Sequence, residues 1–464
     1  MQNRIIYTLP AEKMPIFSIN HYSHSFLKTH MTTQSVLITN VTLFTNPETP
    51  LADNQWLLCR HDLIHSFGPM ESVPVADNAL VIDGTDKLLM PGLINGHNHC
   101  AMTLFRGMAD DLELGEWLNE HIFPAEAANV TPEMVYWCTK LAAAEMILSG
   151  TTTVADGYFH ENQAARALLE SGMRAIPAQA VIDFPAPGVP DPETNIDAVE
   201  TFFTTWQGKD DRIIPGIFAH SPYTCSPDTL QRAKALATRY NAPFFIHIAE
   251  SRHEQQILMD PRGTSPIRHL AALNLLDKNS ILIHCVWLDD EDREIIHESK
   301  AGVVVCPQSH FKLASGIAET AKMDEMGIQV GLGTDGSASN NSLDIFREMD
   351  ILAKSQKLRT LDATAMPAKR VLAAATRNNA KILGLSHVGE ITAGFKADII
   401  LIDMNQPHLQ PFYNSDFLVY NASGADVETV IINGRIVLRD RKLLSFDLEE
   451  CMAEVRKLAV MTLS

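Results

Sequence analysis

The sequence has no long hydrophobic run, no basic tract and no closely spaced pair of cysteines. Apolar residues make up 46% of the 464 residues, but they occur in short segments, far below the ~20 consecutive apolar residues of a membrane helix. The formal charge is −19, with 37 Lys and Arg against 56 Asp and Glu, which disfavours nucleic acid and anionic membranes as partners. None of the seven cysteines forms a Cys-x-x-Cys motif, which favours a reduced, cytoplasmic location over secretion. These absences predict a soluble, globular protein.

The two ends of the chain differ from its middle. Residues 1–30 lack the apolar core of a signal peptide, so we predict a loose N-terminal extension, with Met31 as an alternative start. Short β-like segments with turns begin at Ser35, and similar segments return after Val388. We expect residues 31–90 and residues 388–464 to join into one small β-sandwich, the second part ending in a C-terminal helix.

The middle of the chain, residues 91–387, alternates short apolar segments with helical patterns. This alternation is typical of a parallel α/β sheet. The strand-like segments are LLMPGLING, TTTVAD, MRAIPAQAVI, RIIPGIF, APFFIHIAE, SILIHCV, AGVVVC and GIQVGLGTD. Eight parallel strands close a (β/α)₈ barrel, so the predicted fold is a TIM-like barrel beside a small composite β-sandwich.

Polar residues stand where several of these apolar segments end. In such a barrel the reactive residues lie at the carboxyl ends of the strands. The candidates are His97, His99, His220, His247, Glu250, His284 and Asp335. One buried histidine can be a core residue with a satisfied hydrogen bond, but several at successive strand ends favour a common site.

The motif His97-Asn98-His99 is the first sign of a metal site. Alternation along a strand places residues i and i+2 on the same side, so the two imidazoles can bind one ion while Asn98 points away. Taken alone, the motif is equally consistent with two polar residues in a turn. Asp335 likewise has an alternative interpretation, as the N-cap of the following helix.

Three imidazoles and one carboxylate form a donor set that suits one Zn²⁺ per subunit, with Fe²⁺ or Mn²⁺ as less favoured occupants. A zinc ion lowers the pKa of a bound water to about 7, and a neighbouring base such as Asp335 or His284 can take its proton. Glu250, three residues after His247, is a candidate general acid, with a solvated surface glutamate as the alternative. The set predicts hydrolytic chemistry.

With His97-x-His99, His247, His284 and Asp335 in this order, the chain resembles the amidohydrolase superfamily from about residue 35 to about residue 440. Within that superfamily it is similar to the 5-methylthioadenosine/S-adenosylhomocysteine deaminases. The similar stretches are PGLINGHNHCAMTLFRGMADDLELGEWLNEHIFPAE, FAHSPYTCS, HIAES and GLGTDGSASNNSLDIF.

The resemblance implies a role for each strand-end residue. The zinc ligands would be His97, His99, His247 and Asp335. His284 would orient the attacking water, and Glu250 would protonate a purine ring nitrogen while water adds at the carbon that bears the amino group. A proton would then reach the amine, through Asp335, and ammonia would leave an inosine-type nucleoside.

The resemblance also implies contacts to the substrate. Glu126 would accept hydrogen bonds from ribose hydroxyls, His220 would be a second contact, and Trp117 would form an apolar wall for the base. Their alternatives are a surface charge, a core polar residue and part of a helix core stripe. Relatives with two metals need a bridging lysine at the end of the fourth strand; IFAHSPY carries His220 and no lysine, which favours one metal.

Two features distinguish this chain from the relatives it resembles. His310, in Ser309-His310, stands where an asparagine is usual and adds an imidazole near the barrel mouth. Residues 175–211 contain no arginine to pair an amino-acid carboxylate, so we expect a neutral tail, as in 5-methylthioadenosine or adenosine, to be preferred over S-adenosylhomocysteine. Arg106 is an alternative source of that charge.

Two rival functions remain open at this point. A hydrolase of the same fold could act on another amino- or halo-heterocycle, such as guanine, cytosine or a triazine. A non-catalytic scaffold is the remote alternative, although all four metal ligands are present. The physiological substrate and the oligomeric state, including a homo-oligomer, are not set by the sequence.

Overall fold

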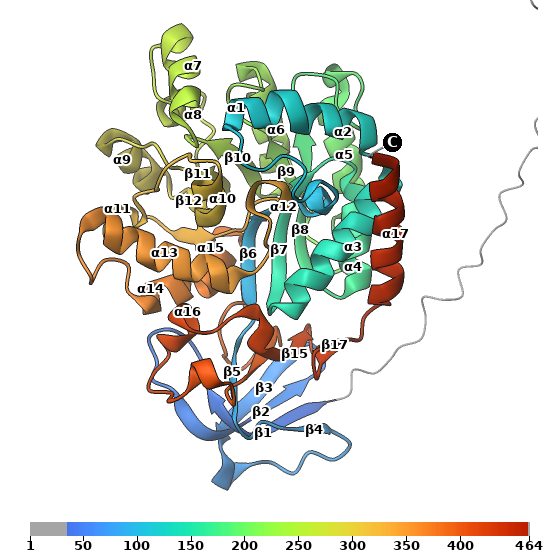
Figure 1. Ribbon diagram of the computed structural model, residues 1–464, viewed down its shortest axis with the longest axis vertical. Helices are drawn as coiled ribbons and strands as arrows, with labels where there is room; N and C mark the ends of the chain where they lie inside the picture. Colours follow the sequence, from blue (N-terminus) through green and yellow to red (C-terminus); the bar gives the residue numbers. More distant parts are fainter. Residues whose placement is uncertain (1–34, 463–464) are drawn as a thin grey trace, which may run out of the picture. The chain divides into compact units, whose positions relative to one another are not determined.

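The computed structural model describes residues 35–462, so the predicted extension over residues 1–30 lies outside the described residues. Its central feature is a sheet of eight parallel strands, whose order in space follows the order in sequence (Figure 1). The strands are β6 (Leu93–Asn98), β7 (Thr151–Tyr158), β8 (Arg174–Val181), β9 (Gly216–Ala219), β10 (Phe244–Ile248), β11 (Ser280–His284), β12 (Gly302–Val305) and β13 (Val330–Leu332). The predicted barrel fold is therefore confirmed.

Side chains close the barrel between its first and last strands, which share no regular ladder among the described pairings. Asn379 Nδ2 donates to the carbonyls of Ile94 in β6 and Leu332 in β13, both at 2.7 Å. A Cβ built on Gly331 would lie 1.9 Å from Asn379 Oδ1, so the asparagine fits only against a glycine. Above this bridge, the Asp335 amide donates to the His97 carbonyl at 3.1 Å.

The barrel interior is filled by alternate residues of the strands. Ile281 and Ile283 of β11 pack together with Phe218 and Phe245 in one buried cluster, whereas Leu282 belongs to the outer cluster beneath the helices. This alternation is the period of two that an extended strand imposes. The interior is thus a packed apolar core, and polar groups are left to the strand ends.

Helices surround the strands, as Figure 1 shows. They are α1 (Leu114–Glu116), α2 (Phe123–Asn129), α3 (Pro132–Leu148), α4 (Glu161–Ser171), α5 (Asn195–Trp206), α6 (Pro227–Tyr240), α7 (Arg252–Arg262), α8 (Pro266–Ala272), α9 (Asp290–Ser299), α10 (Pro307–Lys312), α11 (Thr320–Glu325), α12 (Ser337–Asn340), α13 (Ile345–Thr360), α14 (Ala368–Ala373), α15 (Asn379–Ile382), α16 (Phe417–Tyr420) and α17 (Leu448–Thr462). A π-helical turn, Trp117–Ile122, joins α1 and α2 into one segment, the 114–129 helix. Local sequence sets the ends: Thr131 caps α3 by accepting from the Met134 amide at 3.2 Å.

The β-rich ends of the chain meet in one mixed sheet of nine strands, in the order β17-β16-β15-β14-β5-β1-β2-β3, with β4 beside β1. The strands are β1 (Val36–Leu43), β2 (Ala52–Arg60), β3 (Leu63–Pro69), β4 (Leu80–Asp83), β5 (Lys87–Pro91), β14 (Ile399–Asp403), β15 (Val427–Ile432), β16 (Arg435–Arg439) and β17 (Lys442–Leu443). The antiparallel pair of β5 and β14 joins the two halves. A buried ion pair, Arg174 Nε to Asp398 Oδ2 at 2.6 Å, ties this sheet to the barrel strand β8.

Two details differ from the expected arrangement. The segment LLMPGLING is not one barrel strand: it divides at Gly92, with β5 in the mixed sheet and β6 in the barrel. A Cβ on Gly92 would lie 2.2 Å from the Thr152 side chain, so the turn needs glycine. The C-terminal helix α17 packs on the barrel helix α3, where Cys451 Sγ lies 3.6 Å from the Trp137 carbonyl. The exact limits of the two domains stay a prediction.

Across residues 35–462, no helix has both the length and the apolar character that crossing a membrane requires. Several of these helices are instead amphipathic. For example, α6 buries Leu230, Ala233 and Leu236 on one face, at the spacing of a helix packed on a core.

Candidate active site

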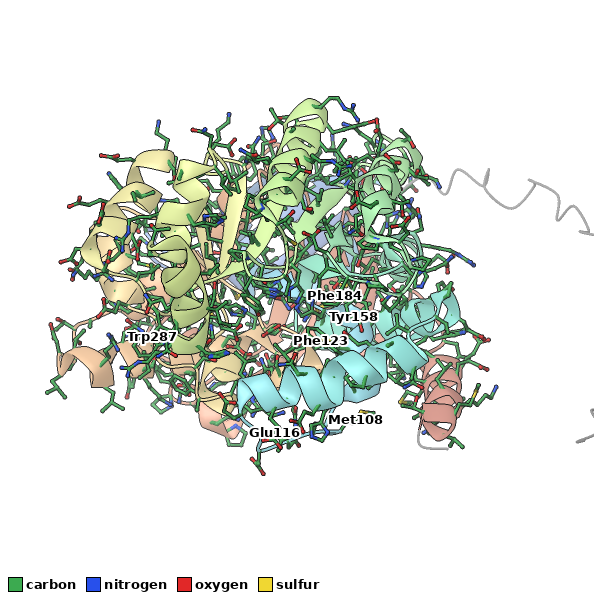
Figure 2. All side chains as sticks on the ribbon, turned by 90° about the horizontal axis from the view of Figure 1, so that it is seen from above. Met108, Glu116, Phe123, Tyr158, Phe184 and Trp287 are labelled. Carbon is green, nitrogen blue, oxygen red and sulfur yellow. The ribbon has the colours of Figure 1, made fainter. Side chains whose placement is uncertain are left out.

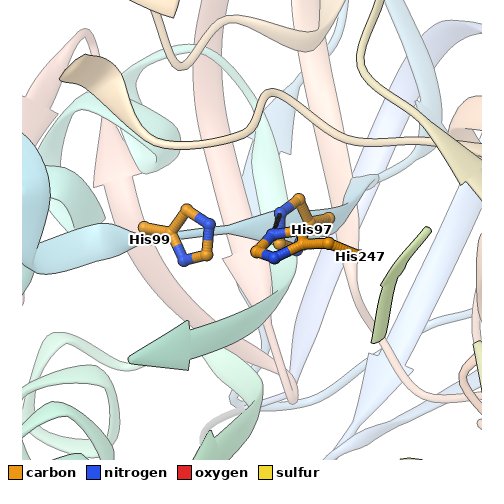
Figure 3. Close-up of side chains that lie close together, drawn as sticks. All are labelled: His97, His99 and His247. Carbon is orange, nitrogen blue, oxygen red and sulfur yellow. Dashed lines mark hydrogen bonds between the residues drawn. The ribbon is translucent and has the colours of Figure 1, made fainter. Parts of the chain in front are cut away.

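Three histidines from two strands converge at the mouth of the barrel (Figure 3). His97 lies in β6, His99 follows that strand directly, and His247 lies in β10. Their candidate ligand nitrogens all lie within 4.8 Å of one another, and the Nε2 atoms of His97 and His247 are 3.3 Å apart. Asn98 points to the opposite side, where its Nδ2 donates to the Asp335 carbonyl at 2.8 Å. The alternation expected for the His-x-His motif therefore holds.

Asp335 completes this cluster. Its Oδ1 lies 3.5 Å from His97 Nε2 and 3.4 Å from His99 Nε2. Ligands bound about 2.1 Å from a tetrahedral zinc ion are about 3.4 Å from one another, so these spacings fit one ion among four donors. Ser309 Oγ donates to the other carboxylate oxygen, Oδ2, at 2.7 Å. The four residues therefore form a candidate metal site.

The protonation of the cluster suits metal binding. Burial lowers the pKa of His97 to about 4, and burial with neighbouring histidines lowers the pKa of His247 well below its usual value. Burial alone would raise the pKa of Asp335, but the hydrogen bond with His97 and the nearby histidines lower it well below the usual value. His99 Nδ1 lies 2.5 Å from the Gly157 carbonyl, which directs Nε2 toward the cluster. The lowered pKa values favour neutral imidazoles at His97 and His247 and an ionised carboxylate at Asp335.

Glu250 is buried beside this cluster, 3.7 Å from His284 Nε2 through its Oε2. Burial and the neighbouring carboxylates of Asp335 and Glu254 raise the pKa of Glu250 well above its usual value. Glu254 holds the turn, because its two oxygens accept the amides of Ala249 at 2.9 Å and Glu250 at 2.8 Å. Glu250 is therefore a neutral acid at the wall of the metal site.

His284 lies at the end of β11, next to His247. Their rings stack with centroids 5.2 Å apart, and burial lowers the pKa of His284 well below its usual value. The ring Nδ1 lies 3.1 Å from Nε2 of His310, which is also buried. The extra imidazole that distinguishes this sequence therefore contacts the candidate water-orienting histidine.

A cavity opens from these residues toward the 114–129 helix. Figure 2 shows Phe123 of this helix close to Tyr158 and Phe184. The cavity is lined by His99, Met102, Leu114, Trp117, Leu118, Ile122, Phe123, Glu126, Gly157, Tyr158, Phe159, Ala180, Phe218, His220, Tyr223, His247, Glu250, His284, Leu313, Asp335 and Ser339. All the residues predicted for the site line this cavity except His97, which lies beneath it.

The candidate substrate contacts line the same cavity as the histidines, and the His220 ring lies 5.1 Å from the His247 ring between centroids. Glu126 is only 6% exposed, which excludes its interpretation as a surface charge. Its Oε1 accepts from the Tyr158 hydroxyl at 2.6 Å, and burial raises its pKa to about 7. Trp117 is buried in the 114–129 helix. His220 Nδ1 lies 3.0 Å from Thr224 Oγ1, which leaves its Nε2 edge for the cavity.

Several residues of the site are not apparent from sequence patterns. Tyr158 follows the predicted strand TTTVAD because β7 continues through Gly157, where a Cβ would lie 2.2 Å from the Phe218 ring. Glu254 looks like one more polar residue in a charged helix. In the sequence, Ser309 is distinguished only by its position next to His310. Phe218 stacks on His97 with ring centroids 5.6 Å apart. Its place in a predicted strand is the only sequence feature that indicates this role.

Comparison with known proteins identifies the family of this chain. The model of the amidohydrolase family matches residues 88–437. The chain belongs to the amidohydrolase family. It is 48% identical over 381 residues to 5-methylthioadenosine/S-adenosylhomocysteine deaminase 1 of Syntrophus aciditrophicus, covering 82% of this chain and 86% of that protein. It is 43% identical over 427 residues to the 5-methylthioadenosine/S-adenosylhomocysteine deaminase of Syntrophobacter fumaroxidans, covering 91% and 97%.

Among solved structures, an adenosine deaminase from Xanthomonas campestris with bound zinc superposes with a TM-score of 0.89 at 32% identity. The match covers 92% of this chain and 98% of that one. The amidohydrolase family and these relatives make the present chain a hydrolytic deaminase that acts on carbon–nitrogen bonds. Its candidate metal site is the one described above.

Proposed function

We propose that this amidohydrolase deaminates purine nucleosides of the adenosine type, giving the inosine-type product and ammonia. The observation that carries the proposal is the pair of buried carboxyl groups that line one cavity. Glu250 lies beside the candidate metal site, and Glu126 lines the same cavity with Tyr158. One carboxyl suits chemistry on the base and the other suits recognition of the sugar. The curated relatives with deaminase names support this assignment.

In this proposal His97, His99, His247 and Asp335 hold one zinc ion. When bound, zinc lowers the pKa of water and makes it a nucleophile at neutral pH. Their lowered pKa values leave the His97 and His247 imidazoles with lone pairs to offer, and the ionised Asp335 carboxylate balances part of the charge of the ion. Fe²⁺ and Mn²⁺ accept the same donors, so metal analysis of the purified protein is part of the test.

Glu250 supplies the proton that the purine ring needs. Its raised pKa keeps the carboxyl protonated near neutral pH, so it can donate to the ring nitrogen next to the carbon that bears the amino group. Protonation at that nitrogen makes the carbon more electrophilic. His284, 3.7 Å from Glu250, faces the same position and orients the water that adds to this carbon.

Asp335 and Glu250 then handle the remaining protons. Water contributes one oxygen and two protons. One proton moves through Asp335 to the amino group, which leaves as ammonia when its bond to carbon breaks. The oxygen stays on the ring as the carbonyl of the inosine-type product, and the second proton, released as that carbonyl forms, restores the Glu250 carboxyl that protonated the ring. Ser309 keeps Asp335 in place during this transfer, because it donates to Oδ2 at 2.7 Å.

Glu126, Trp117 and His220 would hold the nucleoside. Glu126 Oε1 is occupied by the Tyr158 hydroxyl, which leaves Oε2 to accept from ribose hydroxyls. Trp117 offers an apolar surface to the base, and His220 is a further contact. Because the carboxyl is buried, each hydrogen bond to it forms away from competing water.

The cavity favours a neutral tail on the sugar. None of the described side chains that line it is Lys or Arg. Arg106 does not supply the charge, because it pairs with Glu145 and with the Asn341 carbonyl. Burying an amino-acid carboxylate without a cationic partner is unfavourable. We therefore expect 5-methylthioadenosine and adenosine to be better substrates than S-adenosylhomocysteine.

Ammonia release by the zinc-loaded protein tests the proposal. The panel is 5-methylthioadenosine, adenosine, S-adenosylhomocysteine, adenine, guanine, cytosine and an amino-triazine. We expect kcat/KM to be at least tenfold higher for 5-methylthioadenosine than for S-adenosylhomocysteine, and E250Q to lose about 10²- to 10⁴-fold in kcat while keeping its metal. Activity on free bases or triazines alone would overturn the nucleoside assignment, and no activity with bound zinc would favour a scaffold.

A further inference from the structure

One turn of α10 connects three parts of the barrel mouth. Its consecutive side chains each contact a different element: Gln308 Nε2 donates to Glu348 of α13 at 2.7 Å, and Ser309 donates to Asp335. His310 Nε2 lies 3.1 Å from His284 Nδ1. The turn begins directly after β12, so the barrel wall fixes its position. His310 is therefore held at a set distance from His284.

The backbone at His284 explains why its ring needs a support. Strict alternation after Ile283 would direct the side chain outward, but His284 has φ = +80° and Cys285 has φ = +47°. These left-handed conformations are unfavourable for residues other than glycine. They turn the imidazole into the mouth, where its Nε2 edge faces Glu250. The Nδ1 edge faces His310, whose Nε2 lies within hydrogen-bonding distance.

Groups around the ring decide which nitrogen carries the proton. The Glu250 carboxyl group lies on the Nε2 side, with Oε2 3.7 Å from Nε2, and a carboxyl oxygen accepts hydrogen bonds whether or not the group is ionised, which favours a proton on Nε2. A neutral imidazole then has an unprotonated Nδ1, which accepts a hydrogen bond. His310 Nε2 is placed to donate that bond. The result is a His284 that presents an N–H donor to the reacting water.

We propose that His310 is a positioning residue of the deamination site: it donates to His284 Nδ1, fixes the His284 tautomer and keeps the Nε2–H directed at the reacting position beside Glu250. The inference rests on the proposed function. His310 itself does not line the cavity, so it acts through His284. Its loss should therefore change the chemical step and leave substrate binding largely intact.

Three single variants test this role. H310F keeps an aromatic ring but removes the donor, and we expect kcat to fall 10- to 100-fold with KM and metal content within threefold of wild type. H310Q places an amide N–H at about the reach of Nε2, so kcat should recover to within fivefold of wild type. F311L is the matched control: it changes the next residue of α10, which is 44% exposed, and should leave kcat unchanged.

A double-mutant cycle and a spectrum separate positioning from a structural effect. In the H284N background, H310F should cost less than twofold in kcat, because the partner is already gone. Nitrogen-15 spectra of ring-labelled wild-type protein should show His284 protonated at Nε2, and H310Q should keep this pattern whether or not H310F folds. The inference is overturned if H310F retains kcat within twofold, if its cost persists in H284N, or if His284 is protonated at Nδ1.

The controls also separate this inference from the proposed function. If the wild-type protein deaminates none of the adenosine-type nucleosides, the proposed function fails, and the nitrogen-15 spectrum still decides the His284–His310 bond. If the wild type is active and H310F equals it, only the positioning role of His310 is wrong.

Discussion

Within β11, two successive stretches of backbone are built differently. Ile281 and Ile283 point into the barrel in regular extended conformation and pair with β10 and β12. His284, the next residue, leaves that conformation with φ = +80°, and its ring reaches the same side as Ile283. The middle of the strand follows the alternation of a sheet, whereas the end of the strand breaks it to bring one more imidazole to the site.

The same contrast recurs around the mouth. Ala249 after β10 and Asp335 after β13 also have left-handed backbone, with φ of +53° and +63°. Each such residue costs of order 1–3 kcal/mol, and each is held by a buried partner. Glu254 binds the Ala249 amide, Ser309 binds Asp335, and His310 binds His284. The regular interior thus supports a strained rim of residues at the strand ends, and this rim contains residues of the candidate active site.

The largest effect should come from removing the imidazole while relieving its strain. Asparagine tolerates left-handed backbone better than other residues except glycine, so H284N removes the ring at little cost to folding. We expect kcat to fall at least 100-fold, while the free energy of unfolding stays within about 1 kcal/mol of wild type. Kinetics and urea unfolding measure the two effects. If H284N also lowered the free energy of unfolding substantially, the residues at the strand ends would contribute to stability as the interior does.

Some of these positions follow from simple sequence patterns and others do not. His97, His99, His247 and Asp335 are polar residues at the ends of apolar segments, so the candidate metal site could be predicted from the sequence. The direction of the His284 side chain could not be predicted, because alternation alone would send it outward.

Contacts from helices were also beyond the sequence. Ser309 and His310 are neighbours in sequence, yet they serve two different strands, a relation that only the placement of α10 determines. The residues around Glu254 in sequence are those of a surface helix. Glu254 is nevertheless buried, because its carboxylate accepts the amides of the turn that precedes this helix. The eight strands could be counted from apolar segments, but the division of the first at Gly92 depends on its close contact with Thr152.

The interior should show the opposite response. Ile281 is fully buried in the barrel core, and truncating a buried isoleucine to alanine costs about 2–5 kcal/mol through lost burial and the cavity left behind. We expect I281A to unfold at clearly lower urea concentration, with kcat at 25 °C within threefold of wild type. V81A, at a position 55% exposed, is the control and should change the free energy of unfolding by less than about 0.5 kcal/mol. A large loss of kcat in folded I281A would contradict the separation between an interior that sets stability and strand ends that set activity.

The smallest effect is expected from Glu126, which lines the cavity from the regular helix α2. Burial raises the pKa of Glu126 to about 7, and the Tyr158 hydrogen bond partly opposes this. As pH falls through about 7, Glu126 gains a proton and becomes a weaker acceptor for ribose, so kcat/KM for 5-methylthioadenosine should fall by up to tenfold per pH unit. Y158F removes the bond that lowers the pKa, so the fall should begin at higher pH. In E126Q this group no longer titrates, and if its pH profile still matches that of the wild type, another residue controls the acid limb.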